Sequence, residues 1–269
     1  MSLIVLIAVS CGGVGAASAA PRGAATAGAG YWTRYRMEHA VPMGPDTQGS
    51  GGITTKAATG GAVVRDTGKV FFTLDSTDYV CSGAAVGGPS AAVVVTAAHC
   101  VTDGYGGWAT NWVFIPGYDN GDKPYGSFSS RRFFVSRQWN AGMDETYDVA
   151  FVAVSGLSGG LPIGFDANPG SVYVFGYPAE PPYTGNQLRY CDGPVAADPD
   201  NPGGDVGVSC GMTAGDSGGP WLTGYTPAAG TGTVVGVSAF KYSDNDQVLY
   251  GVLFGRTARE LYREALTAR

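Results

Sequence analysis

Short runs of apolar residues alternate with turn-forming residues along most of the chain from about residue 61. Each run is short and rich in Val, Phe, Tyr and Thr, which is typical of strands. The pattern predicts strands at residues 70–74, 91–96, 112–115, 132–136, 149–154, 172–175, 187–191, 233–238 and 248–253. Many short strands at this spacing predict a barrel or a sandwich.

One helical pattern follows the last of these strands. Thr257 and Glu260 have the spacing of a capping box. The next residues, 261–266, place Leu261, Tyr262, Ala265 and Leu266 on one helical face. We therefore expect a C-terminal helix that packs on a β domain.

The first sixty residues have a different composition. Residues 3–9 are apolar and precede Ala17-Ser18-Ala19, which matches the small-x-small cleavage pattern, so we interpret residues 1–19 as a signal peptide. Residues 20–60 are rich in Gly, Ala, Pro and Thr, which favours a propeptide or a flexible N-terminal arm. Their aromatic and basic patch, residues 31–37, is expected to dock on the folded domain at residues 61–269.

Composition and charge limit the partners. The chain has 269 residues, of which 44% are hydrophobic and only 14% charged, so it is long and apolar enough to form a real core. The net charge of −6, with no basic run among aromatics, disfavours nucleic acids and anionic membranes as partners.

Cysteine usage agrees with export. Removal of the leader takes away Cys11 and leaves four of the five cysteines, an even number that favours two disulfides outside the cytosol. Four cysteines allow three connectivities. The sequential pairing would join Cys81 to Cys100 and Cys191 to Cys210, and would close two loops of equal separation.

A serine in a glycine-rich run is the candidate nucleophile. Ser217 lies in the run Gly-Asp-Ser-Gly-Gly-Pro at residues 215–220. Serine needs a base, an acid that orients the base, and donors for the oxyanion. The glycines allow close approach of a substrate chain, and the backbone N–H groups of Gly215 and Ser217 could form the oxyanion hole.

The positions of the two histidines restrict the fold. The serine run also matches the Gly-x-Ser-x-Gly turn of α/β hydrolases, which need a histidine after the serine. Both His39 and His99 precede Ser217, and residues 100–269 contain no histidine. Because His39 lies in the expected propeptide, His99 at the end of an apolar strand is the candidate base.

The orienting acid is sought among the aspartates. Three of them precede His99 and would give the subtilisin order, which needs a helix-rich fold: Asp66, Asp75 and Asp78. In the order His, Asp, Ser, the best candidate is Asp148, at the head of an apolar strand. Asp144, in a more polar stretch, is the alternative.

Three motifs in this order resemble the chymotrypsin/trypsin-like serine protease family. They are Thr-Ala-Ala-His-Cys at residues 96–100, Asp-Val-Ala-Phe at 148–151 and Gly-Asp-Ser-Gly-Gly-Pro at 215–220, and the resemblance covers about residues 61–269. The context of the serine motif and the early Trp32-Thr33 pair resemble exported bacterial members related to glutamyl endopeptidases.

The resemblance implies an all-β fold of two antiparallel six-stranded β-barrels, with the active site between them. It implies a secreted serine endopeptidase in which Ser217 attacks the substrate, His99 is the base and Asp148 orients the histidine. A Cys81–Cys100 disulfide would brace the histidine, and Ser238 would lie on the edge where substrate pairs as an added strand.

The sequence also departs from the family pattern. The usual Ile-Val-Gly-Gly terminus is absent, so we expect an internal arginine to pair with Asp216. Gly211 stands where trypsin carries its specificity aspartate, and Val237 stands where glutamyl endopeptidases carry a histidine. With Phe240 near the pocket wall, we expect a preference for uncharged side chains.

We expect polypeptide substrates, no cofactor, no metal and a monomer. Two other functions stay open: a secreted, non-catalytic binding protein on a protease fold, and a serine esterase.

Overall fold

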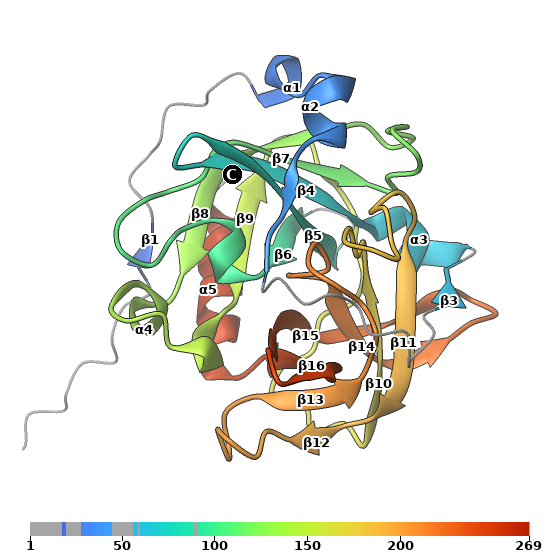
Figure 1. Cartoon of the computed structure of the whole chain (residues 1–269). Helices are drawn as coiled ribbons and strands as arrows, with labels where there is room; N and C mark the ends of the chain where they lie inside the picture. The colour runs from blue at the N-terminus through green and yellow to red at the C-terminus, as the bar shows by residue number, and fades with distance from the viewer. Residues whose placement is uncertain (1–17, 20–27, 45–55, 59, 89–90, 269) are drawn as a thin grey trace, which may run out of the picture.

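The computed structural model describes residues 18–19, 28–44, 56–58, 60–88 and 91–268 (Figure 1). Most of the expected signal peptide and part of the expected arm lie outside the described residues. Within the described part, no helix has the length and apolar character needed to cross a membrane.

Six antiparallel strands form a closed first barrel. They are β4 (Thr67–Leu74), β5 (Thr77–Gly88), β6 (Ala91–Thr96), β7 (Thr110–Pro116), β8 (Phe128–Val135) and β9 (Ala150–Val154). Pairing runs β4–β5–β6–β9–β8–β7 and returns to β4. Successive residues of β4 enter two different cores, Val70 and Phe72 one and Phe71 the other. Because both faces of the strand are buried, its apolar residues 70–72 follow one another without polar alternation.

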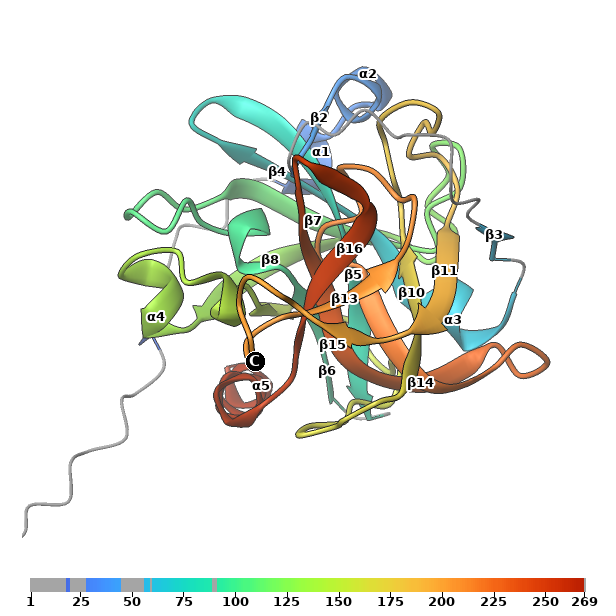
Figure 2. The same cartoon turned by 60° about the horizontal axis from the view of Figure 1, so that its bottom comes forward.

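The second half of the chain forms one curled sheet, a half-barrel (Figure 2). Its longer strands are β10 (Ser171–Gly176), β11 (Arg189–Pro194), β13 (Val206–Ser209), β14 (Pro220–Thr226), β15 (Thr231–Tyr242) and β16 (Asn245–Leu253). The two-residue strands β12 (Ala196–Ala197) and β3 (Lys56–Ala57) lie at its edges. The predicted all-β fold is confirmed, with one barrel closed and the second sheet curled.

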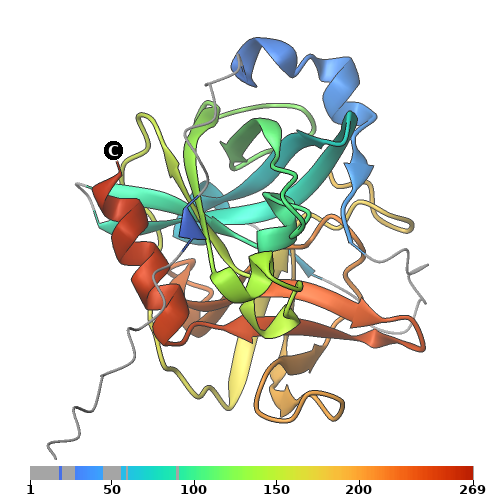
Figure 3. The same ribbon diagram turned by 90° about the vertical axis from the view of Figure 1, so that its left-hand side faces the viewer.

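The C-terminal helix α5 (Arg256–Thr267) covers the first barrel, against β6, β8 and β9 (Figure 3). Its buried side chains include Leu261 and Ala265, as the helical pattern predicts. The predicted capping box is wrong, because the N-cap is Gly255 and makes no side-chain bond. The helix begins one residue before Thr257, so that hydroxyl lies inside the first turn.

The N-terminal segment, residues 28–44, crosses the first barrel. It comprises α1 (Gly28–Tyr31), α2 (Arg34–Glu38) and β2 (Val41–Pro42), and β2 pairs in parallel with β5. Two further short elements flank the barrels: β1 (Ser18–Ala19), which pairs with β8, and α3 (Gly61–Asp66). The short helices α4 (Arg137–Asn140), η1 (Ala98–Cys100) and η2 (Glu145–Tyr147) lie in loops of the first barrel.

Apart from the two-residue strands, β5, β13 and β14 have no counterpart in the sequence-based prediction. β5 contains three glycines and Cys81 between its apolar residues. Gly68 and Gly83 lie against neighbouring strands so closely that a Cβ would meet backbone oxygens. These glycines allow neighbouring strands to pack closely, whereas a glycine in the sequence alone is interpreted as a sign of a turn.

Candidate active site

His99 and Asp148 form a closely bonded pair on the first barrel. His99 lies in η1, directly after β6, and Asp148 lies between η2 and β9. One carboxylate oxygen, Oδ2, lies 2.6 Å from His99 Nδ1, and Oδ1 accepts the backbone N–H of His99 at 2.9 Å. Asp148 is 3% exposed. The carboxylate therefore holds both the ring and the backbone of the histidine in one orientation.

The environment of His99 favours its protonated form. Burial by itself would lower the pKa of His99, but the charge of Asp148 and its hydrogen bond outweigh burial. The pKa of His99 is therefore raised above 6.5. An imidazole with this partner can accept a proton in a reaction and be stabilised as imidazolium.

The two alternative residues have other roles. Asp144 is the N-cap of η2, where its carboxylate accepts the backbone N–H of Thr146 at 3.2 Å. His39 follows α2 on the surface, stacked on Tyr35 and bonded to the Tyr35 carbonyl at 2.8 Å. The structure places neither one beside Ser217.

Ser217 lies in the loop before β14, and the first barrel fixes this loop through Ser82. Ser82 Oγ donates to the Gly215 carbonyl and the Ser82 N–H donates to the Ser217 carbonyl, both at 2.8 Å. Gly215 and Gly218 have positive φ angles of 96° and 80°. At both positions a Cβ would clash with neighbouring atoms, so the loop requires glycine there.

The two disulfides of the sequential pairing are present. Cys81–Cys100 joins β5 to η1, and so links the residue beside Ser82 to the residue beside His99. Cys191–Cys210 joins β11 to the start of the serine loop.

Ser217 and Gly215 both point at a backbone carbonyl from the N-terminal segment. The Gly215 N–H donates to Met43 O at 3.1 Å, and Ser217 Oγ donates to the same oxygen at 3.2 Å. Within the described part of the chain, His99 Nε2 has no hydrogen-bond partner. In this structure the serine hydroxyl is thus bonded to Met43, and the Gly215 N–H donates to the same carbonyl oxygen.

A very small cavity of about 10 Å³ lies behind Ser217. Asp216, Ala239, Phe240 and Lys241 are among its lining residues. Gly211 is buried. Ser238 Oγ accepts a hydrogen bond from Trp221 Nε1 at 3.1 Å. Of the predicted specificity positions, Phe240 is the one that lines this cavity.

Lys241 is the functional residue that the sequence analysis misses. Burial raises the pKa of Asp216 to about 7, against the opposing charge of Lys241 and a hydrogen bond with Ser238. The charge of Lys241 therefore acts on Asp216, and among the described residues no ion pair joins Asp216 to an arginine or to Lys241. Lys241 Nζ also donates to the carbonyls of Cys210 at 2.7 Å and Asp246 at 2.5 Å. Lys241 is the next-to-last residue of β15, and no local sequence pattern indicates that it faces Asp216.

Comparisons with known proteins identify the family and the fold. The Trypsin family model matches residues 58–257. The structure of the protease Anisep from Arthrobacter nicotinovorans is similar over 80% of this chain and all of that chain, with 34% identity and a TM-score of 0.73. A Glu endopeptidase structure has the same fold, with a TM-score of 0.66 over 81% of this chain and 99% of that chain, at 18% identity.

A curated relative matches a smaller part. The "Extracellular metalloprotease" of Bacillus subtilis is 34% identical over 84 residues, which is 31% of this chain and 26% of that protein. The match thus spans about a quarter of the length of that relative.

Proposed function

Since this chain belongs to the trypsin family and is a serine-type endopeptidase, we propose that it is an exported enzyme that cleaves polypeptides with His99, Asp148 and Ser217. The observation that carries the proposal is the buried pair of His99 and Asp148, with 2.6 Å between Nδ1 and Oδ2. A serine loop that the other half of the chain supplies, and that Ser82 fixes, completes the site.

The chemistry follows from these groups. Ser217 Oγ attacks the scissile carbonyl carbon while His99 Nε2 takes its proton. The oxyanion that forms is stabilised by the N–H groups of Gly215 and Ser217. His99 then gives the proton to the leaving amine, the C–N bond breaks and an acyl-enzyme remains. A water molecule attacks the ester in the same way and releases the acid, and Asp148 stabilises the imidazolium in both steps.

A matched pair of aspartate variants tests the assignment. Asp148→Asn should lower kcat on a labelled casein by about ten-thousand-fold, because the histidine loses the partner that sets its tautomer. Asp144→Asn should leave kcat unchanged, since that carboxylate only caps η2. Labelling with a fluorescent organophosphonate, followed by mass spectrometry, should locate the adduct on Ser217.

Activity measurements also separate the proposed endopeptidase from a non-catalytic binding protein and from an esterase. A binding protein on this fold would show neither hydrolysis nor labelling in any processed form. An esterase would hydrolyse ester substrates and leave the matching amides intact. Equal loss of activity in both aspartate variants would contradict the role of Asp148.

The name of the Bacillus subtilis relative raises the question of a metal. Among the described residues, one group of candidate ligands lies close together, Cys81, His99 and Cys100. Both cysteines are joined in a disulfide, so neither can supply the thiolate that zinc binds. These residues do not fit a metal site, and we derive no metal-dependent step.

Export and processing form the second part of the proposal. Two disulfides are typical of an oxidising compartment, and the relative in Bacillus subtilis is named extracellular. We propose removal of residues 1–19 as a signal peptide, with residues 20–60 as a leader to a protease domain at 61–269. N-terminal sequencing of protein from the medium tests this, and a start within residues 1–19 would contradict it.

Substrate preference is the third part. The cavity of about 10 Å³ holds about one water molecule, and Lys241 is bonded to backbone carbonyls there. These features support a small, uncharged side chain before the scissile bond. Mass spectrometry of peptides released from a mixed library would report this preference, and consistent cleavage after Lys, Arg or Glu would refute it.

A further inference from the structure

The segment that ends in Gly44 lies directly on the proposed nucleophile. Met43 O accepts both the Gly215 N–H at 3.1 Å and the Ser217 hydroxyl at 3.2 Å. A Cβ on Gly44 would lie 3.2 Å from Ser217 Oγ and 3.3 Å from the Ala214 side chain, and Gly44 has a φ of 135°. A substrate carbonyl would need the Gly215 N–H and a free Ser217 hydroxyl to attack it, so Met43 and a substrate cannot bind together.

Residues 41–44 do not pair with the edge of β15, where a substrate strand is expected to add. β2 pairs in parallel with β5, with Val41 opposite Tyr79, and the Met43 N–H donates to Val80 O at 2.9 Å. Among the described residues, no backbone hydrogen bond joins residues 41–44 to Ser238 and its neighbours in β15. The Met43 carbonyl is therefore held at the nucleophile without the strand pairing that would align a scissile bond.

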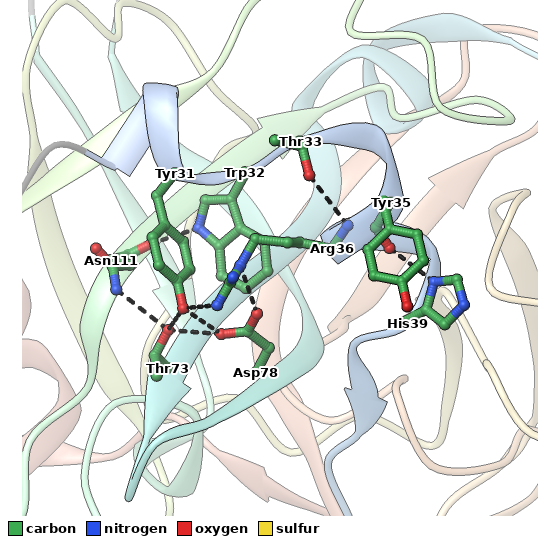
Figure 4. Close-up of polar contacts among 9 residues, drawn as sticks. All are labelled: Tyr31, Trp32, Thr33, Tyr35, Arg36, His39, Thr73, Asp78 and Asn111. Atoms are coloured by element: carbon green, nitrogen blue, oxygen red, sulfur yellow. Dashed lines mark hydrogen bonds and ion pairs between the residues drawn. The ribbon is translucent and has the colours of Figure 1, made fainter.

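The same segment is attached to the first barrel by an anchor cluster, Tyr31, Trp32, Arg36, Asp78 and Asn111 (Figure 4). The Trp32 ring is 3% exposed, and its Nε1–H donates to Asn111 O at 2.6 Å. Tyr31 donates to Asp78 Oδ1 at 2.9 Å. Arg36 Nε lies 2.9 Å from Asp78 Oδ2, and its guanidinium lies 3.9 Å from the centre of the Tyr31 ring. One buried aromatic ring and one ion pair thus fix α1 and α2 on the barrel.

The anchor cluster makes the contact at Ser217 intramolecular. Only six residues separate Arg36 from Met43, and a short tether keeps an attached group at an effective concentration in the millimolar range. Weak contacts at Met43 can therefore occupy the site while the cluster is intact. The site is either blocked by Met43 or free. When one anchor contact is lost, this equilibrium shifts toward the free site, and the size of the shift is the free energy of that contact.

We propose that residues 28–44 are a built-in inhibitor, whose anchor cluster docks on the first barrel and places Met43 on the catalytic centre. The docking surface, centred on Asp78 and Asn111, fits a peptide with adjacent aromatic residues followed by an arginine. This inference rests on the proposed catalytic role of Ser217. It adds a regulatory contact that blocks the site without being cut.

Two arginines of α2 give a matched test in the full-length protein. Arg36 pairs with Asp78, whereas Arg34 pairs with Glu38 on its own helix, and the Arg34 side chain is 76% exposed. Two rates are measured for each variant: labelling of Ser217 by a fluorophosphonate, and hydrogen–deuterium exchange of the Gly215 amide. Arg36→Ala should raise both rates about tenfold, since a charged contact on a part-exposed surface is worth about that factor. Arg34→Ala should change neither.

Two further variants strengthen the test. Arg36→Asp combined with Asp78→Arg should restore slow labelling, because the pair is formed again with the charges exchanged. Gly44→Val should raise the labelling rate with the anchor cluster intact, since the added side chain cannot lie against Ser217 Oγ.

The outcomes separate this proposal from the proposed function. Wild-type rates in both Arg36→Ala and Gly44→Val would overturn the inhibitor. Faster exchange of the Gly215 amide with no labelling in any variant would instead overturn the catalytic role of Ser217, and would still show release of the segment.

Discussion

Lys69 on β4 provides a test of how the first barrel tolerates a buried cation. Its side chain is 3% exposed, and Nζ lies 5.0 Å from the centre of the Phe71 ring and 4.8 Å from that of Tyr118. Within the described residues, no carboxylate lies within ion-pair distance of this ammonium group. We predict that Lys69→Met, which keeps the shape of the stem, stabilises the protein.

The size of this stabilisation follows from the pKa of Lys69. Burial lowers the pKa of Lys69 from 10.5 to about 7, which corresponds to a cost of about 5 kcal/mol for the charged form. Lys69→Met should therefore raise the free energy of unfolding by up to about 5 kcal/mol at pH 6.

The pH dependence has a definite sign. The folded protein releases this proton near pH 7, whereas the unfolded chain keeps it up to about pH 10.5. Between these values the unfolded state binds more protons, so wild-type stability rises with pH by about 1.4 kcal/mol per pH unit. The advantage of the methionine variant is therefore full below pH 7, falls to about 2 kcal/mol by pH 9 and disappears near pH 10.5.

Urea unfolding followed by tryptophan fluorescence measures this difference. Both proteins should carry Ser217→Ala, which prevents self-digestion, and should keep their disulfides. Lys123→Met is the control, because Lys123 lies in a surface loop and should not change the pH slope. Equal stability of wild type and Lys69→Met at pH 6, or the same gap at pH 6 and pH 9, would refute the reasoning.

Three further predictions concern the site and its supports. Replacing Cys191 and Cys210 by serine should lower the unfolding free energy by about 3 kcal/mol in thermal unfolding, because the crosslink closes a loop of 19 residues. The pH profile of kcat/KM should rise through a pKa above 6.5, since His99 must be neutral to act as the base and its pKa is raised; a midpoint below 6.5 would contradict this. Gly218→Ala should abolish casein hydrolysis, because its Cβ would overlap the Thr96 hydroxyl at a positive φ, whereas full activity would show that the loop can move.

Much of the site could be predicted from the sequence because its signals are local. The glycines around Ser217 mark a backbone that other residues cannot adopt, and the scarcity of histidine leaves His99 as the base. The structure brings His99 and Asp148 together, as their positions at strand ends predict. The strands with continuous apolar runs were also predictable, since burial on both faces excludes polar residues.

What the sequence analysis missed depends on contacts between distant segments. Lys241 acts on Asp216 only because β15 passes behind the serine loop, and no local pattern distinguishes it from an arginine elsewhere. The contact of Met43 with Ser217 joins residues 174 positions apart. In the same way, Gly83 of β5 allows close strand packing, which local turn rules cannot recognise.

Helix α5 follows the second sheet in the chain but completes the first barrel. Tyr262 and Phe254 lie against Phe151 of β9, with ring centres 5.5 Å and 5.9 Å apart. During synthesis, β9 leaves the ribosome long before these two rings exist to cover it. Such long-range contacts slow folding. The face of β9 that Phe254 and Tyr262 cover can therefore reach its final packing only after almost the whole chain has been made.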